Sequence, residues 1–198
     1  VVENGAPVNA CSVGKDKVAE QIAGIMGKTA EKTVPMTARV LCGGDCESAK
    51  SKYEYFGVHA CNAANKLAGG QKSCSHGCLG LGSCIKACQF GAISIVDGIA
   101  VIDENKCTAC GMCKKVCPKN VIEIMPKDKK VFVKCNSNDS GKIVNAVCKV
   151  GCIACKMCEK ACPFEAISVS DNLARIDYDK CKACGICAEK CPKKAISK

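Results

Sequence analysis

The sequence predicts an α+β protein that consists of two small modules in tandem, preceded by a small helical segment rich in cysteine. Three observations lead to this prediction. Cysteine supplies 22 of the 198 residues, whereas aromatic residues supply only 4%. One run of four cysteines occurs three times, and a shift of 74 positions superimposes nine cysteines without a gap. Because this composition is thin for one large core, we expect several small cores stabilised by more than side-chain packing.

The recurring run has the spacing C-x2-C-x2-C-x3-C followed by proline, which is the cluster-binding run of bacterial ferredoxins. Thiolates select iron–sulfur clusters or zinc, but zinc ribbons place two CxxC pairs well apart. The close spacing also argues against a disulfide framework. The sequence therefore predicts [4Fe–4S] clusters. The three runs are Cys107, Cys110, Cys113, Cys117; Cys152, Cys155, Cys158, Cys162; and Cys181, Cys184, Cys187, Cys191.

The repeat defines the modules. We expect two 2[4Fe–4S] ferredoxin-like modules at 72–134 and 135–198, after a remnant of another 4Fe–4S domain at 1–28 and a linker with a cysteine-rich insert at 29–71. In such modules the fourth cysteine of a run binds the other cluster of the pair. The expected crossed sets are Cys107, Cys110, Cys113 with Cys88; Cys152, Cys155, Cys158 with Cys191; and Cys181, Cys184, Cys187 with Cys162.

The first run of the first module departs from the pattern, because Leu81 stands where the repeat has Cys155. Cys74 is the nearest replacement, and glycines at 77, 80 and 82 allow the loop to bend around a cluster. We therefore expect Cys74 to complete the set, although it is also available to a neighbouring site in the insert. The expected set is Cys74, Cys78, Cys84 and Cys117.

Six cysteines fall outside these sets: Cys11, Cys42, Cys46, Cys61, Cys135 and Cys148. Cys42, Cys46 and Cys61 predict a fifth cluster that needs one more thiolate, from Cys135, Cys148 or Cys74. The alternative is that some of these thiols are buried and unligated, since free cysteine packs as a small hydrophobe. Cys11 has no partner in this chain.

The formal net charge of +10 counts every thiol as neutral. A [4Fe–4S]2+ core with four thiolates carries about −2, so four clusters lower the total to about +2 and five to about zero. The lysine excess thus compensates clusters, and few aromatic side chains are available for base stacking, which argues against nucleic-acid binding. The sequence shows no 18-residue apolar run, no phosphate-binding glycine loop, no paired general acid and base and no signal-peptide pattern at 1–10.

Local patterns predict the elements between the cysteines. Apolar residues at helical spacing predict a helix over 16–26 that ends at Gly27. We expect two more helices at 47–56 and 62–68, and a linker at 29–38. His59 and His76 are expected in loops and not as ligands.

Three hairpins are also predicted. Asp97-Gly98 joins strands at 94–96 and 100–102, and its repeat copy joins 167–169 to 174–176. A third hairpin is expected between 121–125 and 131–133.

With these motifs in place, the chain resembles the B subunit of the Rnf complex in its clostridial form. The resemblance covers essentially the whole chain and rests on the doubled modules and on the segments RVLCGGDC at 39–46, YEY at 53–55 and GCLGLGSC at 77–84. Rnf is a membrane-bound ferredoxin:NAD+ oxidoreductase that exports sodium ions or protons. The resemblance implies an electron-relay subunit on the cytoplasmic face of the cell membrane, which accepts electrons from reduced soluble ferredoxin and contacts other Rnf-type subunits. It implies no catalytic, flavin or nucleotide site on this chain.

Family members begin with a transmembrane helix and three closely spaced cluster cysteines, followed by a stretch similar to 6–11. This chain lacks that helix and those cysteines, so Cys11 resembles the fourth ligand of a sixth cluster in a longer protein. Two other classes remain open, namely a soluble polyferredoxin and a subunit of a soluble multimeric oxidoreductase such as a hydrogenase. A hydrophobic helix encoded upstream of Val1 would favour the membrane complex.

Overall fold

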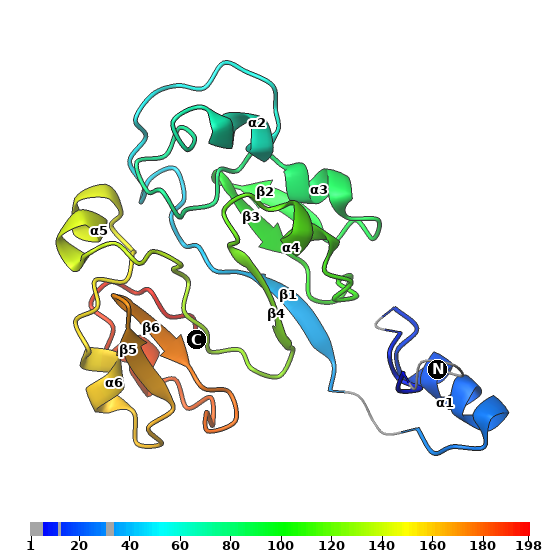
Figure 1. The fold of residues 1–198 in the computed structure, drawn as a ribbon. Coiled ribbons are helices and arrows are strands. Elements are labelled where there is room, and N and C mark those ends of the chain that lie inside the picture. The colour runs from blue at the N-terminus through cyan, green and yellow to red at the C-terminus, as the bar shows by residue number, and fades with distance from the viewer. Residues whose placement is uncertain (1–5, 12, 31–33) are drawn as a thin grey trace.

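The computed structural model describes residues 6–11, 13–30 and 34–198 (Figure 1). Residues 1–5 of the expected N-terminal remnant and 31–33 of the expected linker therefore lie outside the described residues. The helices are α1 (Lys15–Met26), α2 (Cys61–Lys66), α3 (Ser83–Ala87), α4 (Met112–Val116), α5 (Gly141–Val147), α6 (Met157–Ala161) and α7 (Ile186–Glu189). The strands are β1 (Met36–Val40), β2 (Ile93–Val96), β3 (Ile99–Ile102), β4 (Ile122–Pro126), β5 (Ile167–Ser170) and β6 (Leu173–Ile176).

The first module contains two antiparallel strand pairs. β2 and β3 form the predicted hairpin, with Ile93 opposite Ile102 and a turn at Asp97 and Gly98, both of which have positive φ. β4 pairs with β1, a strand from far upstream, with Ala38 opposite Ile124. Figure 1 shows this long-range pair (blue and green) running beside the β2–β3 hairpin. Part of the expected linker is thus the closing strand of this module.

The second module repeats this arrangement. β5 and β6 form the predicted hairpin, with Ile167 opposite Ile176. The chain before the module pairs with the chain at its end, since Val133 forms a bridge with Ile196 and the Ser197 N–H donates to the Phe132 carbonyl at 2.8 Å. The predicted hairpin between 121–125 and 131–133 is therefore wrong. The two segments are neighbours in sequence, but each closes a different module.

One of the three predicted helices is also wrong. α1 is present and ends at Gly27, whose φ of 61° gives the left-handed end that glycine favours, and α2 occupies most of 62–68. The segment 47–56 is not helical. The Asp45 carboxylate accepts hydrogen bonds from the N–H groups of Glu47 and Ser48, as at the start of a helix, but only one turn forms. Residues beyond this turn bridge to distant segments, with Ala49 opposite Cys148 and Ser51 opposite Lys72.

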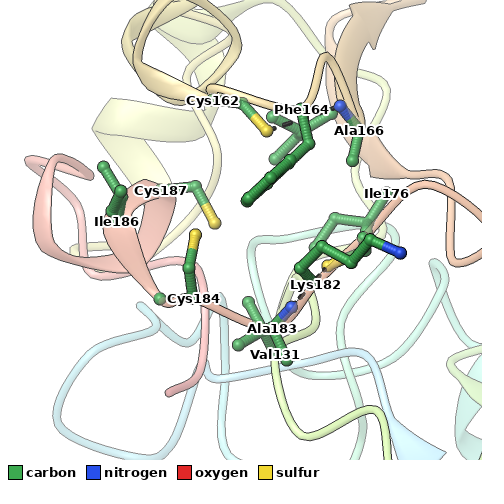
Figure 2. Close-up of a pocket in the computed structure, with 13 residues that line it drawn as sticks. Val131, Cys162, Phe164, Ala166, Ile176, Lys182, Ala183, Cys184, Ile186 and Cys187 are labelled. Atoms are coloured by element: carbon green, nitrogen blue, oxygen red, sulfur yellow. Dashed lines mark hydrogen bonds between the residues drawn. The ribbon is translucent and has the colours of Figure 1, made fainter.

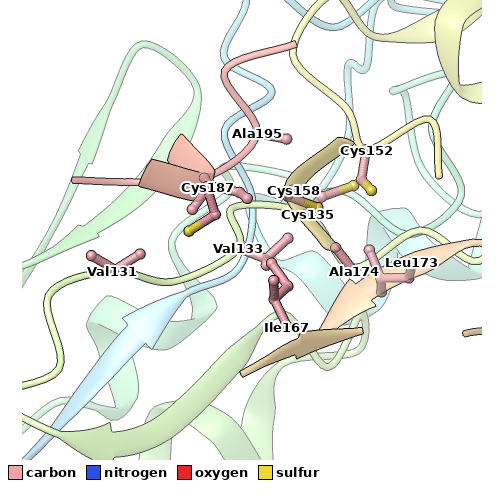
Figure 3. Packing of buried hydrophobic residues seen from close by; sticks show 11 residues of the cluster. Val131, Val133, Cys135, Cys152, Cys158, Ile167, Leu173, Ala174, Cys187 and Ala195 are labelled. Carbon is pink, nitrogen blue, oxygen red and sulfur yellow. The ribbon is translucent and has the colours of Figure 1, made fainter. Parts of the chain in front are cut away.

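Each module has its own small core, and cysteines form part of both. In the first module buried cysteines pack with side chains such as Ile93, Ala100 and Val121. In the second, Figure 3 shows Cys135, Cys152 and Cys158 among Val133, Ile167, Leu173 and Ala174. In the part of the chain that the structure describes, no helix is long and apolar enough to cross a membrane.

We predict that removal of metal unfolds both modules. Their apolar cores are small and thiols line them, so ligand binding contributes folding free energy that packing cannot replace. Chelation of anaerobic protein should abolish most of the far-ultraviolet circular dichroism of the short helices and hairpins. Native-like circular dichroism and protection from proteolysis in metal-free protein would contradict this prediction.

Candidate metal centres

Four loops of the same shape present the first three positions of each cysteine run. In every loop, the residues two and four positions after the first cysteine have positive φ: Gly80 and Gly82, Ala109 and Gly111, Ala154 and Lys156, Ala183 and Gly185. These left-handed residues curl the backbone around a central space. The first loop keeps this shape although Leu81 replaces the second cysteine.

A short helix follows each loop and fixes the third and fourth sulfurs of the run. The third cysteine of each run is buried in α3, α4, α6 or α7, as Cys84, Cys113, Cys158 or Cys187. The fourth cysteine lies at the end of the helix or directly after it, as Cys88, Cys117, Cys162 or Cys191. The fourth side chain therefore leaves the loop that carries the other three.

Three cavities are each lined by one of the crossed sets that the sequence predicts. Counted together with the part that is open to solvent, the spaces between their lining atoms are about 340, 360 and 310 Å³. Figure 2 shows Cys162, Cys184 and Cys187 directing their sulfurs into the first of them, beside the ring of Phe164. The sets are Cys162, Cys181, Cys184 and Cys187; Cys152, Cys155, Cys158 and Cys191; and Cys88, Cys107, Cys110 and Cys113.

Backbone amides point at several of these sulfurs. The Cys107 sulfur accepts N–H bonds at 3.4 Å from Ala38 of β1 and from Ala109 of its own loop. Ala183 donates to Cys181 at 3.4 Å, and Ala195 donates to Cys191 at 3.3 Å. Such donors stabilise negative charge on thiolates and tune the reduction potential of a cluster.

The set of Cys78, Cys84 and Cys117 in the first module needs a fourth cysteine. The structure offers Cys61, which the sequence pattern places in a different site. Burial raises the pKa of the Cys84 thiol to about 12, with smaller contributions from the neighbouring thiols of Cys78, Cys61 and Cys117. Cys61 begins α2, and its N–H donates to the Ser83 hydroxyl at 2.7 Å, directly beside Cys84. The structure thus brings Cys61, and not the expected Cys74, to the other three thiols.

Cys74 lies in a different cavity of about 400 Å³, together with Cys42, Cys135 and Cys148. Burial raises the pKa of the Cys74 thiol, and Cys42 and Cys148 add to this rise. The three cysteines of the expected site therefore lie apart, with Cys42 in this cavity, Cys61 beside Cys84 and Cys46 at the β2–β3 turn. Residues 71–73 are paired with the insert backbone at Lys50 and Lys52, which turns Cys74 away from Cys84.

Cys46 and Cys11 are both exposed. The Cys46 N–H donates to the Asp97 carbonyl at the β2–β3 turn. Cys11 accepts an N–H bond from Gly14 and lines an open cavity near Cys107. His59 is exposed, whereas His76 lies beside the cavity of Cys74, 3.6 Å from Asp139.

The donor sets suit iron–sulfur clusters. Among the described residues, no three Cys, His, Asp or Glu side chains converge on one point that would hold a single metal ion. A cubane does not require such convergence, because each thiolate binds a different iron atom. Each of these sites has four thiols around a space of about 310 to 400 Å³. Together with the backbone N–H groups that point at several sulfurs, this arrangement fits a [4Fe–4S] cluster.

The fold and these sites define an iron–sulfur protein of the ferredoxin class that binds several [4Fe–4S] clusters. Comparison with known families agrees. Residues 151–196 match the 4Fe-4S dicluster domain, and residues 100–123 match the 4Fe-4S binding domain.

Three relatives identify the family more closely. The chain is 45% identical to the B subunit of the Na+-translocating ferredoxin:NAD+ oxidoreductase complex of Acetobacterium woodii, and 46% identical to the B subunit of the proton-translocating complex of Clostridium ljungdahlii. These alignments cover 92% and 91% of this chain but only 55% and 64% of the relatives. It is 47% identical to the B subunit of the ion-translocating oxidoreductase complex of Methanosarcina acetivorans, over 91% of this chain and 69% of that protein. The chain belongs to this family of B subunits, the Rnf family, and spans a little over half the length of the first of these relatives.

We predict that Gly80→Ala disrupts the first loop, whereas Gly91→Ala is tolerated. A Cβ on Gly80 would lie 2.4 Å from the Gly98 carbonyl oxygen, while a Cβ on Gly91 meets nothing within 4 Å. Both residues have positive φ, a strain of roughly 1–2 kcal/mol for alanine, so only the clash distinguishes them. Gly80→Ala should lose about four iron atoms per chain and Gly91→Ala none. Equal iron contents in the two variants would contradict this prediction.

Proposed function

We propose that this chain relays electrons within an ion-translocating ferredoxin:NAD+ oxidoreductase complex. The observation that carries the proposal is the succession of cysteine-lined cavities along both modules, in a chain whose relatives are named as subunits of such complexes. The clusters supply one-electron transfer without proton chemistry. The electrons come one at a time from reduced ferredoxin, and two of them, together with one proton from solvent, reduce NAD+ to NADH on another subunit. The chain works at the cytoplasmic face of the membrane, held there by the partner subunits and a membrane helix upstream of this sequence.

The protein residues have three tasks in this relay. Sixteen cysteines hold the four module clusters in crossed sets, with Cys61 completing the set of Cys78, Cys84 and Cys117. Inward amides such as those of Ala38 and Ala183 stabilise thiolate charge. The small apolar cores exclude water from one side of each cavity and lower the local dielectric constant, which sets the reduction potential together with the amides.

The proposal is tested by mixing the anaerobic holoprotein with reduced ferredoxin. The visible absorbance of the clusters should bleach on the timescale of mixing, and dithionite serves as the control reductant. Bleaching by dithionite but not by ferredoxin would reject ferredoxin as the donor.

A second measurement addresses the complex. The tagged full-length protein should copurify from detergent-solubilised membranes with subunits that reduce NAD+. Recovery of the full-length protein in the soluble fraction without partners would instead indicate a soluble polyferredoxin.

We predict that Cys61→Ala damages one cluster of the first module and that Cys46→Ala does not. Cys61 is beside Cys84, whereas Cys46 is exposed at a turn, so the pair is a matched control within the same insert. Cys61→Ala should convert one four-iron cluster to a three-iron form or lose it, as seen by EPR of the oxidised protein. An unchanged spectrum for Cys61→Ala, with a three-iron signal in Cys46→Ala, would contradict this prediction and identify Cys46 as the ligand in place of Cys61.

A further inference from the structure

A fourth four-cysteine cavity lies between the modules. It is lined by Cys42 from the chain before the first module, by Cys74 from within that module, and by Cys135 and Cys148 from the first part of the second module. Its space of about 400 Å³, which includes a part open to solvent, is close to the 310 to 360 Å³ counted in the same way for the three cavities of the ferredoxin runs. We propose that these four cysteines hold a fifth [4Fe–4S] cluster that joins the two modules.

Glycines line this cavity where side chains would fill it. A Cβ on Gly44 would lie 3.1 Å from the Ala49 Cβ, 3.5 Å from the Cys148 sulfur and 3.8 Å from the Cys42 sulfur. A Cβ on Gly77 would lie 3.6 Å from the Cys74 sulfur and 3.8 Å from that of Cys42. Both glycines thus border the space between pairs of sulfurs. The absence of side chains there leaves room for inorganic atoms.

A buried cation also faces this site. Lys72 lines the cavity and is only 5% exposed, and its ammonium donates to the carbonyls of Gly44 at 2.6 Å and Gly98 at 3.0 Å. A buried ammonium is costly unless negative charge lies nearby. The Asp45 carboxylate is within electrostatic reach of Lys72, and a cluster with four thiolates, which carries about −2, adds further negative charge beside it.

Hydrogen bonds from both sides hold the four cysteines in place. The Gly43 N–H donates to the Lys134 carbonyl at 3.0 Å, next to Cys42 and Cys135. The backbone on either side of Cys148 is bonded to the insert. The Lys50 N–H donates to the Val147 carbonyl at 2.9 Å, and the Lys149 N–H donates to the Ser48 carbonyl at 2.8 Å. Figure 1 shows α5, which ends at Val147, on the side of the second module that faces the insert. The site is therefore assembled only when the modules are docked.

The junction site also contacts a cluster site in each module. The Cys78 N–H, in the first module, donates to the Cys42 sulfur at 3.4 Å. Cys135 packs in the same buried cluster as Cys152 of the second module. A cluster at the junction therefore provides a stepping site between the modules. This assignment uses 20 of the 22 cysteines and leaves only Cys11 and Cys46 outside.

The test uses iron analysis and EPR of the anaerobic full chain with paired alanine variants. The wild type should hold about 20 iron atoms, and Cys42→Ala and Cys74→Ala about 16 each. The double variant of Cys42 and Cys74 should also hold about 16, because both thiols serve one cluster. The double variant of Cys42 and Cys61 should fall to about 12, because these thiols serve different clusters. Cys46→Ala is the matched control and should keep about 20.

The reverse result would be about 12 iron atoms in the double variant of Cys42 and Cys74 and about 16 in that of Cys42 and Cys61. It would overturn the proposal in favour of a set containing Cys42, Cys46 and Cys61. A wild type with about 16 iron atoms, or with zinc in addition to 16 iron atoms, would also overturn it, and this result requires no variant to fold. The EPR signals of the module clusters report folding in each variant. None of these readouts depends on ferredoxin as donor, so failure here is distinct from failure of the proposed relay.

Discussion

Four cysteine sulfurs must face one cavity in each cluster site, and most features of this structure follow from that requirement. The loops after Cys78, Cys107, Cys152 and Cys181 adopt paired left-handed residues because an extended or helical backbone would point successive sulfurs apart. Each loop then enters a helix of only four or five residues, which is long enough to bury one sulfur and release the next to the opposite cavity. The hairpins cover these sites, so the cores form around thiols and not apart from them.

The crossed sets couple the two halves of each module. Cys88 follows α3 but faces the cavity of the loop after Cys107, and Cys162 follows α6 but faces the cavity of the loop after Cys181. The proposed junction site extends this coupling to the whole chain through Cys42, Cys74, Cys135 and Cys148. A protein held in this way gains stability from its redox centres and keeps them at fixed separations, which is what electron transfer between them requires.

The repeat has diverged at the junction, and the divergence has a structural meaning. Cys61 and Cys135 are equivalent positions of the repeat, as are Cys74 and Cys148. Cys74 and Cys148 share one cavity, yet Cys61 lies beside Cys84 while Cys135 lies with Cys74 and Cys148. The difference agrees with the substitution at Leu81, since the role proposed for Cys61 is to replace the thiol that the first module lacks. The two modules are therefore related in sequence but not interchangeable.

The sequence by itself determined the class of protein, the α+β fold, the two modules, two of the three predicted hairpins and the crossed sets that line three of the cavities. These features depend on spacings of a few residues, and short loops leave the backbone little choice. The tertiary structure decided the pairing of β4 with β1, the course of 47–56 and the positions of Cys61 and Cys74. Proximity in sequence favoured Cys74 as the partner of Cys78 and favoured a hairpin at 121–133. The hairpin is wrong because β4 pairs with β1, more than 80 residues upstream, and no local pattern encodes so distant a partner. Cys74 lies in the junction cavity because hydrogen bonds between the backbone at 50–52 and 71–73 position the chain directly before it.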